Sequence, residues 1–144
     1  MKAFLDTSVL VATFYADHEH HSPSIDLFLR FGKANACCGA HSLAEVYATL
    51  TSMPAPRRVS GHEALLFLGD IRDNLTLFPL DEQEYFQVVA ASAAGNLLGG
   101  AVYDAILGQC ALKADAEAVY TWNMKDFLRL SPAIAARVRT PEQQ

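Results

Sequence analysis

The chain has 144 residues, of which 51% are hydrophobic and 19% are charged, and its formal net charge is -5 at pH 7. This length is typical of one domain with a single core, and the composition excludes a disordered or fibrous protein. The negative charge excludes a protein that covers nucleic acid with a general basic surface, so any binding of phosphate needs local basic residues or a metal ion.

The first half of the chain alternates short apolar runs with helical patterns. In chain order it predicts a strand at 2–5, a helix at 7–16, a helix at 23–32, a strand at 34–38 and a helix at 41–52. The polar residues 18–24 separate the first two helices. Two prolines within residues 53–58 cannot continue a helix, so this segment is expected to be a loop.

The second half continues the alternation. It predicts a helix at 60–73, a strand at 75–80, a helix from Asp81 to Ala94, a helix at 101–114, a strand at 116–122, a short helix at 126–130 and a strand at 136–140. Asp81 and Glu84 have the spacing of a capping box. Such alternation predicts a three-layer α/β/α sandwich around a four- to five-stranded, mainly parallel sheet, as one domain over 1–140 with a tail at 141–144.

The chain carries no signal for a membrane or a disulfide framework. Its longest uncharged stretch near the start, residues 7–16, is too short to cross a bilayer, and no secretory segment is expected. The three cysteines include an adjacent pair and no CxxC motif, and Cys110 is expected in the core. A reducing, cytoplasmic location is the expectation that follows.

Polar side chains stand where the predicted strands end. Asp6 directly follows the first strand, and Glu45 lies on the first turns of the helix after the second strand. Asn123 and Asp126 follow the fourth strand, and Asp104 lies early in the helix that leads into it. Because open α/β sheets bind ligands beyond the carboxyl ends of their strands, these are the candidate catalytic residues.

Each acid also has an ordinary structural interpretation. Asp6 suits the N-cap of the helix that follows it, and Ser42 with Glu45 spells a capping box. Asp104 suits the positive end of its helix dipole, and Asp126 suits the cap of the turn after it. These interpretations stay open at the level of sequence.

The local charges favour a shared cation. No Lys or Arg lies within one helical turn of Asp6, Glu45 or Asp104, and the helix around Asp104 is mostly apolar. If the three carboxylates meet, mutual repulsion raises their pKa values unless a divalent cation lies between them. Ligands that are all oxygen favour Mg²⁺ or Mn²⁺.

Four motifs in order cover nearly the whole chain: FLDTSVLV, SLAEVYATL, AVYDAILGQCA and TWNMKDF. They resemble the four motif regions of PIN-domain proteins, and the small size resembles the VapC type, the toxin of toxin-antitoxin pairs. The resemblance implies a metal-dependent endoribonuclease that hydrolyses RNA. It also implies a VapB-type antitoxin as partner and a homodimer.

By this resemblance Asp6, Glu45 and Asp104 hold one or two Mg²⁺ or Mn²⁺ ions. Thr7 or Ser8, together with Thr121, would supply supporting hydroxyls. The chain departs from the family at its last motif, where the fourth acidic position is often occupied by Asp and here is Asn123. Either Asp126 compensates through a bound water or a second metal is poorly held.

Several further residues are candidates for contacts with RNA. The basic ones are Lys33, Arg57, Arg58, Lys125 and Arg129, and the aromatic ones are Tyr47, Tyr103 and Trp122. His18, His20 and His21 lack a fourth ligand for zinc and suit a polar surface linker.

Other enzyme classes fit the sequence less well. A GxGxxG or GxxxxGK[ST] motif is absent, and an aspartyl phosphatase needs a second Asp where Ser8 stands. The remaining alternative is a catalytically silent PIN-like protein-interaction module. Its contacts would come from apolar side chains such as Phe28, Phe31, Leu66 and Phe67.

Overall fold

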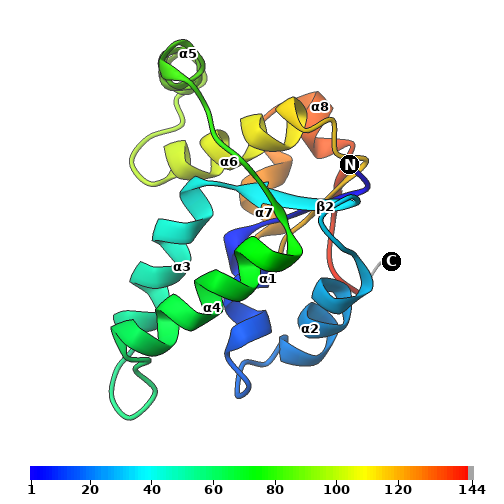
Figure 1. Ribbon diagram of the computed structural model, residues 1–144. Coiled ribbons are helices and arrows are strands. Elements are labelled where there is room, and N and C mark those ends of the chain that lie inside the picture. The colour runs from blue at the N-terminus through cyan, green and yellow to red at the C-terminus, as the bar shows by residue number, and fades with distance from the viewer. Residues whose placement is uncertain (143–144) are drawn as a thin grey trace.

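Five short strands form one sheet at the centre of the molecule (Figure 1). The computed structural model describes residues 1–142. The strands, in the spatial order β3-β2-β1-β4-β5, are β1 (Ala3–Leu5), β2 (Ala36–Gly39), β3 (Thr76–Phe78), β4 (Ala118–Tyr120) and β5 (Val138–Arg139). Every pairing between these strands is parallel, which confirms the predicted parallel α/β/α sandwich.

Helices cover both faces of the sheet. One face carries α1 (Thr7–Phe14), α2 (His21–Arg30), α3 (His41–Thr51) and α4 (Gly61–Asn74). The other carries α5 (Glu82–Ala94), α6 (Ala101–Lys113), α7 (Met124–Leu128) and α8 (Pro132–Ala135). Because strand side chains alternate between faces, Ala3 and Leu5 join the first core and Phe4 the second.

Two helices begin earlier than predicted, and a third lies in a segment where none was predicted. Helix α2 begins at His21 rather than near residue 23, because Pro23 is tolerated in the first turn. Helix α7 begins at Met124 rather than 126. Helix α8 was not predicted, although Ser131 caps it by accepting a hydrogen bond from the Ile134 N–H (3.2 Å) and a proline follows the cap.

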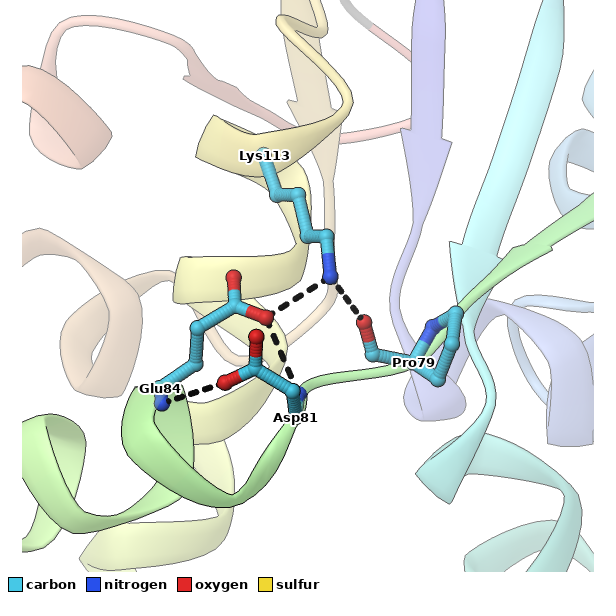
Figure 2. A network of polar contacts seen from close by, with 4 residues as sticks. All are labelled: Pro79, Asp81, Glu84 and Lys113. Atoms are coloured by element: carbon cyan, nitrogen blue, oxygen red, sulfur yellow. Dashed lines mark hydrogen bonds and ion pairs between the residues drawn. The ribbon is translucent and has the colours of Figure 1, made fainter.

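Helix α5 stands at the edge of the molecule and is tied to α6 at its first turn (Figure 2). The predicted capping box is present: Asp81 accepts from the Glu84 N–H at 2.8 Å, and Glu84 accepts from the Asp81 N–H at 2.9 Å. Lys113 of α6 donates to Glu84 and to the Pro79 carbonyl, both at 2.8 Å. These contacts lower the pKa of the Glu84 carboxyl and tie the start of α5 to the end of α6.

The order of the strands reverses beside β1. The chain passes from β1 to β2 and β3 on one side and then returns to β4 and β5 on the other. The Asp6 N–H donates to the Tyr120 carbonyl at 2.9 Å, so the carboxyl ends of β1 and β4 lie together. A ligand crevice forms at such a switch point, and Asp6 and Thr121 stand at its two sides.

Three other expectations meet the structure here. Cys37, Cys38 and Cys110 are buried free thiols, and burial raises the pKa of Cys110 to about 11. Within residues 1–142, no helix has the length and apolar character needed to span a membrane. Of the predicted tail, Pro141 is buried and residues 143–144 lie outside the described residues, so the domain boundary at 140 stays a prediction.

Candidate functional site

A cleft of about 460 Å³ opens at the switch point of the sheet. Its lining consists of Asp6, Thr7, Ser8, Val11, His18, Glu19, His20, Glu45, Thr49, Asp104, Trp122 and Asn123. Four of the five predicted catalytic residues are in this set, although they come from distant parts of the chain. The set contains four carboxylates and neither Lys nor Arg.

Asp6 is both a helix cap and a cleft carboxylate. It is only 2% exposed and accepts from the Ser8 N–H in the first turn of α1, at 3.3 Å. The hydroxyls of Ser8 and Thr121 each donate to the same Asp6 oxygen, Oδ2, at 2.8 Å. Burial raises the pKa of Asp6 and these hydrogen bonds oppose the rise. Asp6 therefore caps α1 and also lines the cleft.

The hydroxyls also join the ends of β1 and β4. The Ser8 hydroxyl accepts from the Trp122 N–H at 3.0 Å, and the Thr121 hydroxyl accepts from the Asn123 N–H at 2.9 Å. The two hydroxyl oxygens are 3.3 Å apart. This network holds the Asp6 carboxylate against the start of the segment that carries Asn123.

Glu45 reaches the cleft from α3 and is half-buried. The Thr7 hydroxyl lies 3.2 Å from Glu45 Oε1 and 3.3 Å from the Ser42 hydroxyl, and it donates to both. The predicted capping box of Ser42 and Glu45 is wrong, because α3 begins at His41 and its N-cap, Ala40, has no side-chain bond. Burial and the nearby Asp6 charge raise the pKa of Glu45, while the Thr7 bond opposes them.

Asp104 lies in the first turn of α6 and is half-buried. Burial, followed by the charges of Asp6, Asp126 and Glu45, raises the pKa of Asp104 to about 6, and Arg129 opposes this rise only weakly as the last of the contributions. The charges of Asp6 and Glu45 thus act on Asp104, so the three carboxylates repel one another across the cleft.

Of the two candidate residues in the last motif, one lines the cleft and the other does not. Asn123 is exposed, lines the cleft and occupies the N-cap of α7 without a side-chain cap bond. The predicted cap role of Asp126 is wrong, since this residue lies inside the first turn of α7 and pairs with Arg129 at 3.7 Å. Asp126 is not part of the cleft lining, and it acts on Asp104 through its charge.

The three cleft carboxylates have the chemistry that a hard divalent cation prefers, but they do not lie close enough together to hold one. Asp6, Glu45 and Asp104 offer carboxylate oxygens to one cleft that holds no basic side chain, as Mg²⁺ and Mn²⁺ prefer. Among residues 1–142, no three His, Cys, Asp or Glu side chains are already gathered closely enough to hold a metal ion. A shared cation would need these carboxylates to lie closer together than they do in the described residues.

Sequence reasoning missed one group of residues at the cleft. His18 and His20 line it, although they were expected on a surface linker, whereas Trp122, which also lines it, was already an aromatic candidate for contact with RNA. Sequence offers no clear sign of this position, because both histidines lie in the turn between α1 and α2, whose path depends on the tertiary structure. The basic residues predicted to contact RNA (Lys33, Arg57, Arg58, Lys125 and Arg129) are all exposed and outside the cleft lining.

Replacing Thr121 by Val is expected to lower the free energy of unfolding by about 1–3 kcal/mol, because a buried donor to Asp6 and an acceptor for the Asn123 N–H are both lost. Urea denaturation at neutral pH measures the effect. Thr49→Val, at an exposed position of α3, is the matched control and should change stability by no more than about 0.5 kcal/mol. Equal stability of the two variants would contradict the role assigned to Thr121.

The comparisons with known proteins agree on one family. A model of the PIN domain matches residues 3–131. Ribonuclease VapC40 of Mycobacterium tuberculosis is 35% identical over 112 residues, which are 78% of this chain and 80% of that protein.

Solved structures agree on the fold. The crystal structure of Mycobacterium tuberculosis VapC20, described as a toxin that cleaves the sarcin-ricin loop, has a TM-score of 0.71 at 15% identity and covers 87% of this chain and 92% of its own. VapBC2 from Rickettsia felis, bound to a DNA fragment from its promoter, has a TM-score of 0.65 at 15% identity, with 97% and 98% covered. With the family match over residues 3–131, the chain belongs to the PIN-domain family, as its four motifs predicted.

Proposed function

We propose that this protein is an endoribonuclease dependent on Mg²⁺ or Mn²⁺ and the toxin of a toxin-antitoxin pair. The observation that carries the proposal is the cleft at the switch point, where Asp6, Glu45 and Asp104 share one electrostatic field without a basic side chain. The identity to a protein named a ribonuclease supports the same reaction class. The likeness to VapC20 and VapBC2 supports the type of toxin through the fold.

The residues of the cleft would have different roles in the reaction. Asp6 is fixed by Ser8 and Thr121 and would anchor the cation, and Asp104 would complete its position from the opposite helix. A bound divalent cation supplies an activated water and neutralises charge that develops on the phosphoryl oxygens. Asn123 offers an amide oxygen at the mouth of the cleft, and Asp126 adds negative charge behind Asp104.

Glu45 is suited to orient the attacking water. The Thr7 hydroxyl holds its Oε1 at 3.2 Å, so the other carboxylate oxygen remains to accept a hydrogen bond from water. The water oxygen attacks phosphorus, the bond from phosphorus to the leaving ribose oxygen breaks, and that oxygen takes up a proton. The raised pKa of Glu45 brings its proton affinity nearer to neutrality, as a group that receives the water's proton needs.

Partners follow from the same family assignment. We propose an antitoxin of the VapB type and a homodimer as the assembly. Exposed apolar side chains are available for both, including Leu66 (61% exposed) and Phe86 (76%). Phe28 is not available, because it is only 5% exposed and belongs to the core, which corrects the interface set expected from sequence. Phe31 and Phe67 pack partly against the same core.

The silent interaction module remains the second candidate, favoured by one observation. The carboxylates of residues 1–142 are not yet gathered for a metal ion. Incubating the purified, antitoxin-free protein with cellular RNA decides between the two candidates. The enzyme is expected to cut RNA in Mg²⁺ or Mn²⁺ and to lose this activity in EDTA, and sequencing the new RNA ends gives the target. Absence of cleavage in either metal would favour the silent module.

A further inference from the structure

The proposed active-site cleft has an electrostatic problem. Glu19 adds a fourth carboxylate to Asp6, Glu45 and Asp104, and the lining contains neither Lys nor Arg. A cation offsets this charge at the reacting phosphate, but the neighbouring RNA phosphates still meet a negative surface. Affinity beside the cleft must therefore come from groups other than basic side chains, and stacking on nucleobases is the interaction that RNA-binding proteins use for this purpose.

One ring platform stands on the β4 side of the cleft. The His20 ring lies flat on the Trp122 indole, with ring centroids 3.7 Å apart and planes 8° apart. The indole cannot turn freely, because Trp122 Nε1 donates to the buried Ser24 hydroxyl at 2.8 Å. The His20 backbone N–H donates to His18 Nδ1 at 3.0 Å, and the His20 side chain is 34% exposed. Trp122 covers one face of the imidazole, the tilted His18 ring lies with its centroid 5.7 Å away, and Glu19 Oε1 lies 3.6 Å from Nε2, so the exposed part of the ring lines the cleft between these groups.

A second ring pair stands on the other side. His41 of α3 and Tyr103 of α6 stack with ring centroids 5.4 Å apart and planes 11° apart. They line a neighbouring hollow of about 350 Å³, and Glu45 and Thr49 line both this hollow and the cleft. Tyr103 is 48% exposed and directly precedes Asp104. The carboxylates therefore lie between two stacked pairs of an imidazole and a larger aromatic ring.

We propose that these two ring pairs are nucleobase platforms, and that each holds one unpaired nucleotide beside the scissile phosphate. The inference rests on the proposed ribonuclease function and adds to it the side chains that hold unpaired nucleotides beside the cleft. Bases of a duplex already stack on their neighbours and expose only their edges, so they cannot lie on these rings.

Binding of a fluorescein-labelled, single-stranded oligoribonucleotide of mixed sequence tests the proposal by anisotropy. The Asp104→Asn protein in Mg²⁺ serves as the background, so that cleavage does not disturb the measurement. His20→Ala and His41→Ala are each expected to weaken binding by about tenfold, since removing a stacking ring costs that much per base. His20→Phe and His41→Phe keep a flat ring and should bind within about twofold of the background.

His62→Ala is the matched control, because His62 is exposed on α4 and lines neither hollow. Its binding should equal that of the background. Trp122 is the only tryptophan of the chain, so its fluorescence reports on the His20 platform alone. RNA should change this fluorescence in the background protein and in the His41→Ala protein alike.

Equal binding of single-stranded RNA and a duplex of the same sequence would overturn the proposal, as would unchanged binding in both alanine variants or no binding by the background protein. These failures are separable from failure of the proposed function. If the wild-type protein still cuts RNA in Mg²⁺, the proposed ribonuclease function is retained and only the proposal of the nucleobase platforms is rejected. If it cuts no RNA, the reaction itself is wrong, whatever the binding shows.

Discussion

Asp104→Asn is expected to reduce RNA cleavage by at least about a hundredfold, because an amide is neutral and binds a divalent cation more weakly than a carboxylate. The same change should stabilise the protein in EDTA. Burial and then repulsion by Asp6, Asp126 and Glu45 raise the pKa of Asp104 to about 6, so its ionised form at neutral pH destabilises the fold. One pKa unit is worth about 1.4 kcal/mol, and after solvent screening we expect a gain of about 1–2 kcal/mol.

Initial rates on a labelled RNA and urea denaturation in EDTA measure the two effects. Asp70→Asn is the matched control, since Asp70 is exposed on α4 and lies outside the cleft lining. It should leave both quantities unchanged. A variant that loses activity together with stability would indicate a structural role for Asp104, and a variant that keeps the wild-type rate would remove this residue from the site.

The position of the site could be predicted from sequence because it follows from topology. The patterns of β1 and β4 are short and apolar, and parallel strands bring their carboxyl ends to one edge. Asp6 follows one of these strands directly and Thr121 follows the other, so their meeting at 2.8 Å requires only the correct strand order. The four motifs predicted which residues belong to the site, and the strand order itself comes from the structure.

The contacts around Glu45 could not be predicted in the same way. Ser42 and Glu45 match a local capping signature, and sequence offers no sign that Thr7, far away in the chain, takes both side chains instead. A tertiary contact of this kind overrides a local preference of similar energy. The stacking of His20 on Trp122 was hidden for the same reason, since it joins a turn to a strand end across the first core.

Exposure was the second quantity that sequence left open. Phe28 and Leu66 have similar hydropathy and both lie on amphipathic helices, yet one is 5% exposed and the other 61%. Which of the two faces the core depends on how α2 and α4 turn against α1 and α3, and that angle follows from packing rather than from periodicity. Which apolar side chains are exposed and available for an interface therefore has to be taken from the structure.

Mg²⁺ or Mn²⁺ is expected to raise the melting temperature by about 5–10 °C at neutral pH when the cation is about a hundredfold above its dissociation constant. The gain should depend on pH. Asp104 has a raised pKa in the folded protein, about 6 against 3.8, and Asp6 and Glu45 are raised as well. The folded state therefore holds protons that the unfolded state has released, and without metal its stability falls as pH rises through this window.

Thermal melts in EDTA and in metal, recorded from about pH 4 to pH 7, separate these contributions. At the acid end Asp104 is protonated in the folded protein, so the metal should add little stability, and its effect should grow as the carboxylates ionise. The double variant Asp6→Asn and Asp104→Asn should lose both the response to metal and most of the decline in EDTA. If wild-type melts are insensitive to both cations across this range while the decline in EDTA persists, then the carboxylates repel one another without binding a metal, and the silent interaction module becomes the better account of the fold.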